Sequence, residues 1–232
     1  MKNIVDERPT DTPNGRYQYS TRFVNSSDIK DRSILDIGCG FGWFEKFALD
    51  SGCKSISGIE ISEEDLSTAK IHLKDNRLDL KVGSALEIPH QENSFDTLVS
   101  WEVIEHIPTN TEEKMFAEAA RVIKPGGSFY LSTPFDSWRS KFTDPAWWLI
   151  EHRHYSQKQL ESLAMKYGFK VVDMRVIGGW GFVLWSLNMY FSKWVLRRRP
   201  IFSNFVNRIV NSEFEKDNGF ALIFCHFEYV GE

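Results

Sequence analysis

The chain has 232 residues, of which 42% are hydrophobic and 26% are charged. This length suits one domain with a substantial buried core. The net charge of −4 argues against a polyanion such as nucleic acid as a general partner. Three cysteines, an odd number, follow a polar N-terminus without a signal peptide, which favours reduced thiols and a cytoplasmic location.

Residues 1–29 are expected to form an N-terminal arm and a cap on the domain that occupies residues 30–232. Pro9 and Pro13 favour an irregular arm. A short helix is expected within residues 16–28, before the first strand.

The chain is organised around residues 33–42, Ser-Ile-Leu-Asp-Ile-Gly-Cys-Gly-Phe-Gly. Ile34, Leu35 and Ile37 indicate a short buried strand, and a helix is expected after Gly42. A strand that leads through glycines into a helix is typical of a nucleotide-type pocket, because a side chain would block the approach of the backbone to the ligand. A glycine turn without a ligand is the alternative.

The glycine spacing separates this stretch from the dinucleotide signature. It is G-x-G-x-G rather than G-x-G-x-x-G, which disfavours a nicotinamide dehydrogenase. Asp36 lies just before the first glycine, where it would repel a pyrophosphate but suit a cationic ligand with an amino group. Residues 35–42 resemble the first motif of the class I S-adenosylmethionine (SAM) dependent methyltransferases.

Later elements extend this resemblance to residues 30–176 and 219–230. They are F-D-x-x-V-S at 95–100, E-V-x-E-H-I at 102–107 and K-P-G-G at 124–127, in the order found in the family. The K-P-G-G element is expected to form the turn after a helix at 111–123. The resemblance implies an α/β, three-layer Rossmann-like fold with a seven-stranded sheet in the order 3-2-1-4-5-7-6. The last strand would be antiparallel.

The SAM site is expected at the ends of the first strands. Glu60 ends a second buried strand, 55–60, and a carboxylate there can accept hydrogen bonds from both ribose hydroxyls. By the resemblance, residues 83–89 would hold the adenine, although Ser84 stands where the family commonly has Asp. A cap contact from Tyr17 or Tyr19 is also implied by the resemblance. The cofactor-binding residues expected are Asp36, Gly38, Cys39, Gly40, Gly42, Glu60, Ser84, Ala85, Leu86 and Trp101.

Glu102, Glu105 and His106 follow the fourth strand and would share one face if this segment is helical. His106 is expected to act as general base, since an unshifted histidine pKa near ~6.5 suits proton transfer at neutral pH. In an alternative, these three residues, with His152 or His154, hold a divalent metal ion. The E-x-x-E-H order resembles the ubiquinone-pathway O-methyltransferases and the small-RNA 2′-O-methyltransferases, some of which depend on metal. In a third interpretation Glu102 contacts the cofactor side, Glu105 is structural, and His106 is a hydrogen-bonded pocket residue.

The segment 134–155 follows the fifth strand on the side where open α/β sheets bind ligands, so it is expected to form the acceptor wall. The wall residues expected are Trp138, Trp147, Trp148, His152 and His154.

Residues 178–218 form an aromatic-rich helical insertion before the last strand, longer than a plain connection. The run 182–191 is apolar on most sides, and Lys193 and Arg197 to Arg199 follow it. This uncharged run is shorter than the ~20 residues of a membrane span. Segment 180–199 is therefore expected to be either a lid packed on the domain or a second subunit, or a helix lying on the inner face of a membrane.

Together these expectations predict a SAM-dependent methyltransferase that acts on a small-molecule or lipid-like acceptor. The E-x-x-E-H resemblance favours oxygen as the methylated atom. A glycan or polyketide-type methyltransferase and a SAM-binding protein without turnover are the alternatives. The chain is expected to be a monomer or a homodimer. The sequence reveals neither the acceptor nor the methylated atom.

Overall fold

The computed structural model describes residues 8–10, 13, 15–150, 152–197, 200, 203–216 and 218–231. The side chains of residues 148–150, 193–194 and 203–204 also lie outside the described part. Most of the predicted arm is therefore not among the described residues. The cap helix is present as α1 (Arg16–Phe23), followed by a 3₁₀ turn at Ser26–Asp28.

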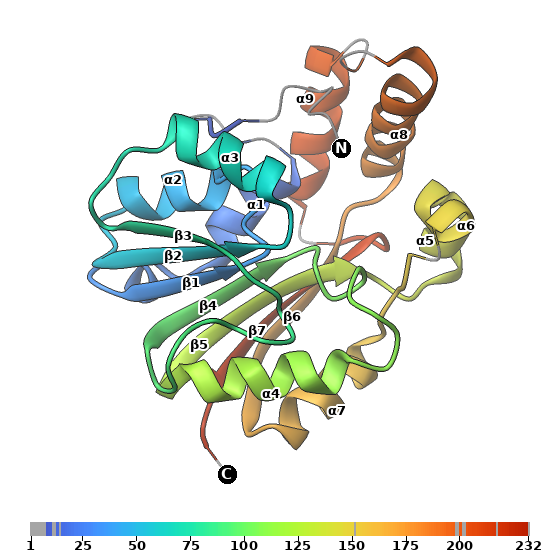
Figure 1. Ribbon diagram of the computed structural model, residues 1–232. Helices are drawn as coiled ribbons and strands as arrows, with labels where there is room; N and C mark the ends of the chain where they lie inside the picture. Colours follow the sequence, from blue (N-terminus) through green and yellow to red (C-terminus); the bar gives the residue numbers. More distant parts are fainter. Residues whose placement is uncertain are drawn as a thin grey trace.

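A seven-stranded sheet forms the centre of the fold (Figure 1). Its strands are β1 (Ser33–Ile37), β2 (Ser55–Glu60), β3 (Leu78–Val82), β4 (Phe95–Trp101), β5 (Ile123–Pro134), β6 (Phe169–Ile177) and β7 (Leu222–Tyr229). The order is β3-β2-β1-β4-β5-β7-β6, and β7 pairs antiparallel with both β5 and β6. The predicted fold class and strand order are confirmed.

Helices cover both faces of the sheet. They are α2 (Trp43–Asp50), α3 (Glu63–His72), α4 (Glu112–Val122), α5 (Trp138–Thr143), α6 (Pro145–Ile150), α7 (Gln157–Lys166), α8 (Trp180–Tyr190) and α9 (Ser203–Phe214). On one face, α4 and α7 bury Phe116 and Leu160 against Phe129 of β5. On the other, Phe44 of α2 packs with Tyr19 of α1 and with residues of α9. Figure 1 shows α2 and α3 opposite α4 and α7.

The glycine loop between β1 and α2 depends on left-handed backbone. Gly38 and Gly42 have φ angles of +82° and +87°, which other residues rarely adopt. A Cβ on Gly42 would lie 2.7 Å from Leu73 Cδ1 and 3.0 Å from the Cβ of Ala69 on α3. The last glycine of the motif therefore lets α3 pack closely against the start of α2.

One conditional arrangement is not formed, and one local prediction is wrong. The segment after β4 is a turn rather than a helix: Glu102 has a φ of +58°, and His106 N donates to Val103 O at 2.9 Å. Lys124 to Gly127 do not separate α4 from a later strand, because Ile123 already pairs with Phe95. The strand then bulges over these four residues before pairing resumes at Ser128.

The insertion between β6 and β7 consists of α8, a π-helical turn η2 (Phe191–Leu196) that continues it, and α9. The chain leaves and re-enters the sheet at Gly178 and Gly219, which form an isolated bridge. Figure 1 shows α8 and α9 standing side by side beyond the ends of the strands. None of the helices in the described part of the chain is long and apolar enough to cross a bilayer.

Candidate active site

One pocket of about 480 Å³ lies at the carboxyl ends of the parallel strands. Its walls come from the glycine loop, α1, the turn after β4, the segment before α7, and α8. Ligands of open α/β sheets bind at this edge. The pocket brings together Gly38, Cys39, Gly40 and Trp101 from the predicted cofactor site with Glu102, Glu105, His106 and His152 from the predicted acceptor side.

The glycine loop provides an open cradle on the cofactor side. Gly40 has a φ of +51°, and a Cβ built there would meet no atom within 4 Å. Gly40 N donates to Glu60 Oε2 at 3.1 Å, and Glu60 Oε1 accepts from Ser62 N at 3.0 Å. The carboxylate at the tip of β2 is thus fixed beside the loop, but Glu60 is not among the residues that line the pocket.

Asp36 is almost fully buried and lies outside the pocket lining. It faces Glu45 of α2, which is also fully buried, and among the described residues no cationic side chain pairs with either carboxyl group. Burial, followed by the charge of Glu45, raises the pKa of Asp36 well above its usual range, and burial raises that of Glu45 to about 8. Gly58 makes room for this pair, because a Cβ there would lie 2.5 Å from Glu45 Oε1.

A cationic ligand suits this cofactor side. Two buried carboxyl groups lie beneath the loop with no cationic partner among the described residues, and the backbone cradle at Gly40 is open. The ammonium and sulfonium groups of SAM supply positive charge, so the residues present fit this cofactor. Sequence reasoning did not find Glu45, since an acid in the first turn of a helix is ordinary.

The predicted adenine segment lies outside the lining of this pocket. Ser84 Oγ accepts from Leu86 N at 3.1 Å, which closes a tight turn after β3, and Ala85 is buried. Trp101 does line the pocket and packs against Trp43 and Phe44 of α2. Its indole Nε1 is buried and has no hydrogen-bond partner in the described part of the chain, which leaves a donor available to a ligand.

The cap α1 closes one side of the pocket. Tyr17 lines it and packs on Trp43, with ring centroids 4.7 Å apart. Arg16 reaches Glu102 Oε2 at 3.4 Å, and Ser132 donates to Glu102 Oε1 at 2.7 Å. Both carboxylate oxygens of Glu102 are therefore engaged, one by Arg16 and one by Ser132. Tyr19, the other predicted cap residue, is buried in the core.

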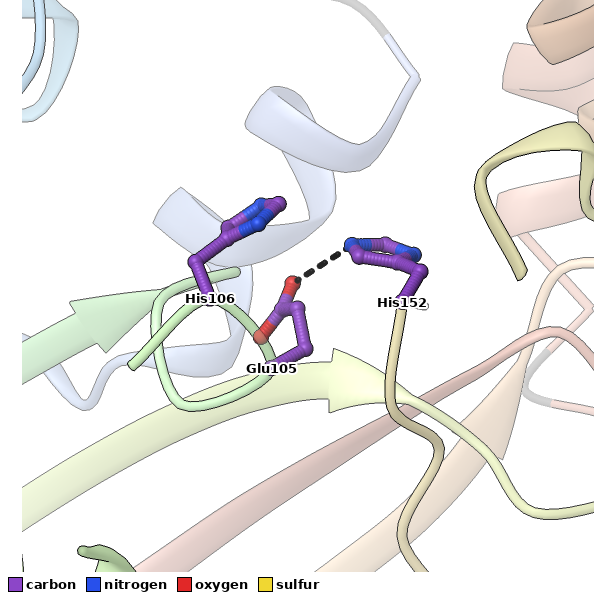
Figure 2. Close-up of side chains that lie close together, drawn as sticks. All are labelled: Glu105, His106 and His152. Atoms are coloured by element: carbon purple, nitrogen blue, oxygen red, sulfur yellow. Dashed lines mark ion pairs between the residues drawn. The ribbon is translucent and has the colours of Figure 1, made fainter. Parts of the chain in front are cut away.

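Glu105, His106 and His152 converge on the acceptor side (Figure 2). One carboxylate oxygen and one nitrogen from each ring lie within 4.8 Å of one another. Glu105 Oε2 accepts from Thr133 at 3.0 Å, but its Oε1 is buried without a hydrogen bond and lies 3.8 Å from His152 Nε2. Burial, followed by the charge of Glu102, raises the pKa of Glu105 well above its usual range.

His106 is exposed at the pocket wall, yet enough protein surrounds its ring to disfavour the charged form. Burial, followed by the charges of His152 and Arg16, lowers the pKa of His106 to about 4. The ring is therefore neutral at pH 7. Its centroid lies 4.7 Å from that of His152.

Asp144, which precedes α6, holds two histidines. Its Oδ2 lies 2.9 Å from His152 Nδ1 and 2.9 Å from His154 Nε2, and its Oδ1 accepts from Ala146 N. Burial would raise the pKa of Asp144, but the hydrogen bonds from the two histidines hold it well below its usual range. An ionised carboxylate only accepts, so the proton of this hydrogen bond is on His152 Nδ1, and Nε2 is the ring nitrogen on the side of Glu105.

The predicted acceptor wall is only partly brought to the pocket. His152 lines it, whereas His154 is buried behind Asp144. Trp138 is 74% exposed on the outside of α5, and Trp147 packs on His154 without lining the pocket. The side chain of Trp148 lies outside the described part of the chain.

The insertion supplies wall residues that the sequence did not single out. Six residues of α8 line the pocket: Phe182, Val183, Trp185, Ser186, Met189 and Tyr190. They fall on one face of α8. The sequence predicted that this helix is a lid or a membrane helix, but it did not predict which face lines the pocket. Burial raises the pKa of Tyr190 to about 12, so this phenol is neutral.

Comparisons with known proteins agree with this geometry. The family model for the methyltransferase domain matches residues 15–174. The ubiquinone biosynthesis O-methyltransferase of Dechloromonas aromatica is 33% identical over 108 residues, 45% of each chain. Phosphoethanolamine N-methyltransferase 2 of Caenorhabditis elegans is 31% identical over 155 residues, 65% of this chain and 35% of its own. The chain spans about half the length, or less, of the curated relatives it matches.

Solved structures share the fold. An S-adenosylmethionine dependent methyltransferase from Mesorhizobium loti has a TM-score of 0.64 at 15% identity, covering 91% of this chain and 96% of that one. Geranyl diphosphate C-methyltransferase from Streptomyces coelicolor has a TM-score of 0.65 at 13% identity, covering 92% and 79%. With a family model that matches more than half of its length and with this fold, the chain belongs to the class I SAM-dependent methyltransferases.

Proposed function

We propose that the chain transfers a methyl group from SAM to a hydroxyl oxygen of a small-molecule or lipid-like acceptor. The observation that carries the proposal is that the glycine loop and the histidine pair His106 and His152 line one pocket. Oxygen acceptors must lose a proton during transfer, and a neutral imidazole is suited to receive it. The curated relatives include O-, N- and C-methyltransferases, so they support methyl transfer without selecting the atom.

The chain's own residues divide the work. SAM, when bound, supplies the activated methyl group. Gly38, Gly40 and Glu60 would hold the nucleoside side, and a cation above the buried pair Asp36 and Glu45 would favour the ionised form of these carboxyl groups. Holding two reactants in attack geometry can lower a barrier by roughly 7 to 11 kcal/mol, so positioning is the larger contribution.

The proton acceptor in this proposal is His152. The sequence favoured His106, but a pKa of about 4 makes its ring a weak base at neutral pH. His152 lies next to it, and Asp144 fixes its Nδ1–H so that the Nε2 lone pair faces Glu105 and the pocket. His106 would then contact the acceptor beside it.

A divalent metal ion at Glu105, His106 and His152 is the alternative way to activate a hydroxyl. One carboxylate oxygen and two imidazole nitrogens form a donor set that several transition metals accept. Glu102, which the sequence included among the ligands, is bound by Arg16 and Ser132 instead. Turnover that is unchanged in EDTA would exclude this alternative.

The experiment is mass spectrometry of a cell extract incubated with purified protein and deuterated-methyl SAM. A product that carries the heavier methyl identifies the acceptor and the methylated atom, and added S-adenosylhomocysteine (SAH) should suppress it. A labelled sugar or a flat polyketide would favour the two alternative acceptor classes. Calorimetric binding of SAH without any labelled product would favour a SAM-binding protein without turnover.

The proposal also includes a cytoplasmic location and a monomeric or homodimeric state. Cys39, Cys53 and Cys225 are all buried free thiols, which is consistent with a reducing compartment.

A further inference from the structure

Exposed apolar side chains gather on the helices around the pocket. Among the described residues, sixteen large hydrophobic side chains are exposed, and ten of these lie on α5, α8, η2 and α9. They are Trp138, Phe142, Trp180, Leu184, Leu187, Phe191, Val195, Leu196, Phe205 and Ile209. A concentration of this kind marks an interaction surface rather than scattered surface residues.

The helix α8 is apolar on two opposite faces. Trp180, Leu184, Leu187 and Phe191 are exposed by 61%, 45%, 46% and 49%, and their spacing of four, three and four residues places them on one face. The pocket-lining residues of α8 fall on the other face. The inner face of α8 lines the pocket. The outer face of α8 is apolar and exposed, so it is available to a separate binding partner.

The charges around this outer face favour an anionic surface. The segment 180–197 contains no acidic residue, although the chain as a whole carries a net charge of −4. Arg197 is exposed at the end of η2, Arg208 is exposed on α9 between Phe205 and Ile209, and Arg139 is exposed on α5 with its guanidinium over the ring of Trp138. Arginines and tryptophans at the edge of an apolar face are typical of helices that lie in a membrane interface.

We propose that the outer face of α8 and η2, with the exposed aromatic side chains of α5 and α9, docks on an anionic lipid surface. The pocket would then draw an amphiphilic acceptor from that surface, its reactive hydroxyl reaching His152 while its apolar part stays against Phe182, Trp185 and Met189. This acceptor class rests on the proposed function. The docking itself does not, because it depends only on the outer face.

The docking test is flotation of the purified full chain with vesicles in a density gradient. Vesicles of phosphatidylcholine with phosphatidylglycerol are compared with vesicles of phosphatidylcholine alone. The variant is the double substitution Leu184→Glu and Leu187→Glu, which changes two outer-face residues that do not line the pocket. The matched control is Ile71→Glu with Met165→Glu, which adds the same charge on exposed positions of α3 and α7.

The proposal expects the wild type and the control to float with the anionic vesicles, and the outer-face variant to float at least tenfold less. It is overturned if the wild type stays at the bottom of the gradient, or if the control loses as much binding as the variant. It is also overturned if light scattering finds a dimer that the outer-face substitutions dissociate and no flotation occurs, since a second copy then covers this face.

Two further measurements separate docking from catalysis. Calorimetry with SAH should give the same affinity for the wild type, the variant and the control, and a failure of all three to bind SAH would remove the proposed function while leaving the flotation result intact. Deuterated-methyl SAM is then supplied with separate lipid and aqueous extracts. Label confined to the aqueous extract would overturn the amphiphilic acceptor.

Discussion

Asp144 Oδ2 lies 2.9 Å from Nδ1 of His152, and its other oxygen accepts from the backbone of Ala146. The carboxylate is therefore fixed at both ends and sets the tautomer of the ring that faces the pocket. This relationship gives the acceptor side a definite direction for proton transfer, since Nε2 is the nitrogen left to accept.

Asp144→Asn should lower kcat without changing the affinity for SAH. Its amide oxygen would keep the contact with Ala146 N, which turns the NH₂ group toward His152 and favours the tautomer protonated on Nε2. The expected loss is roughly tenfold or more, and its upper limit is the 10²- to 10⁴-fold that a positioned base contributes. Steady-state kinetics with the labelled acceptor and calorimetry with SAH check both parts, and an unchanged kcat would refute the orienting role.

His152→Ala should cost more activity than His106→Ala. A base contributes about 10²- to 10⁴-fold, whereas loss of a contact residue such as His106 should cost about tenfold. The pKa of His106 is about 4, so this ring does not titrate between pH 6 and 8. His106→Gln should therefore reduce kcat by the same factor at every pH in this range. A greater loss of activity in His106→Ala than in His152→Ala, or a changed pH dependence in His106→Gln, would show that His106 is the base.

Gly40→Ala and Gly42→Ala should fail in different ways. At Gly42 the added methyl meets Leu73 and Ala69 at a φ of +87°, so we expect a loss of stability of about 2 kcal/mol or more. At Gly40 the methyl meets nothing within 4 Å, so the chain should fold with a loss of about 1 kcal/mol. SAH should nevertheless bind at least tenfold more weakly, because the cradle is filled. Denaturant unfolding and calorimetry compare the two variants, and full SAH affinity in Gly40→Ala would contradict the cradle.

Glu45 should make the unliganded protein less stable as the pH rises. Its pKa is raised by burial from 4.5 to about 8, so between these values the folded state holds a proton that the unfolded state releases. The free energy of unfolding should then fall by up to about 1.4 kcal/mol per pH unit across this window. Glu45→Gln should flatten the fall, and urea unfolding at pH 5, 6, 7 and 8 measures it. An equal slope in both proteins would show that Glu45 does not carry this proton.

The sequence predicted the sheet strands and the glycine loop because both depend on local patterns of residues. Apolar runs predict β1, β2 and β4. The glycines within residues 38–42 are predictable because the backbone has a positive φ at each of these glycines. The family resemblance added the strand order, which no local pattern contains. Asp36 was expected to meet the cofactor directly, whereas it lies beneath the loop against Glu45, a contact between β1 and α2 that spacing alone does not reveal.

The acceptor side was harder to predict because distant segments build it. The turn at Glu102 depends on a left-handed residue that is not glycine, so the helical face considered for Glu105 and His106 is not formed. Asp144 belongs to no sequence motif, and its role follows only from its hydrogen bonds with His152 and His154. Trp138 was expected at the pocket by its residue type, yet α5 turns this side chain outward.

The insertion begins and ends at two touching glycines. A Cβ on Gly219 would lie 2.3 Å from Gly178 O, and the next two backbone amides, of Phe220 and Ala221, donate to that same oxygen. Both ends of the segment that walls the pocket therefore meet at one backbone oxygen, while α9 keeps Val206, Val210 and Phe214 in the core. A change in the length of this segment that spares α9 would leave the pairing of β6 with β7 unaltered.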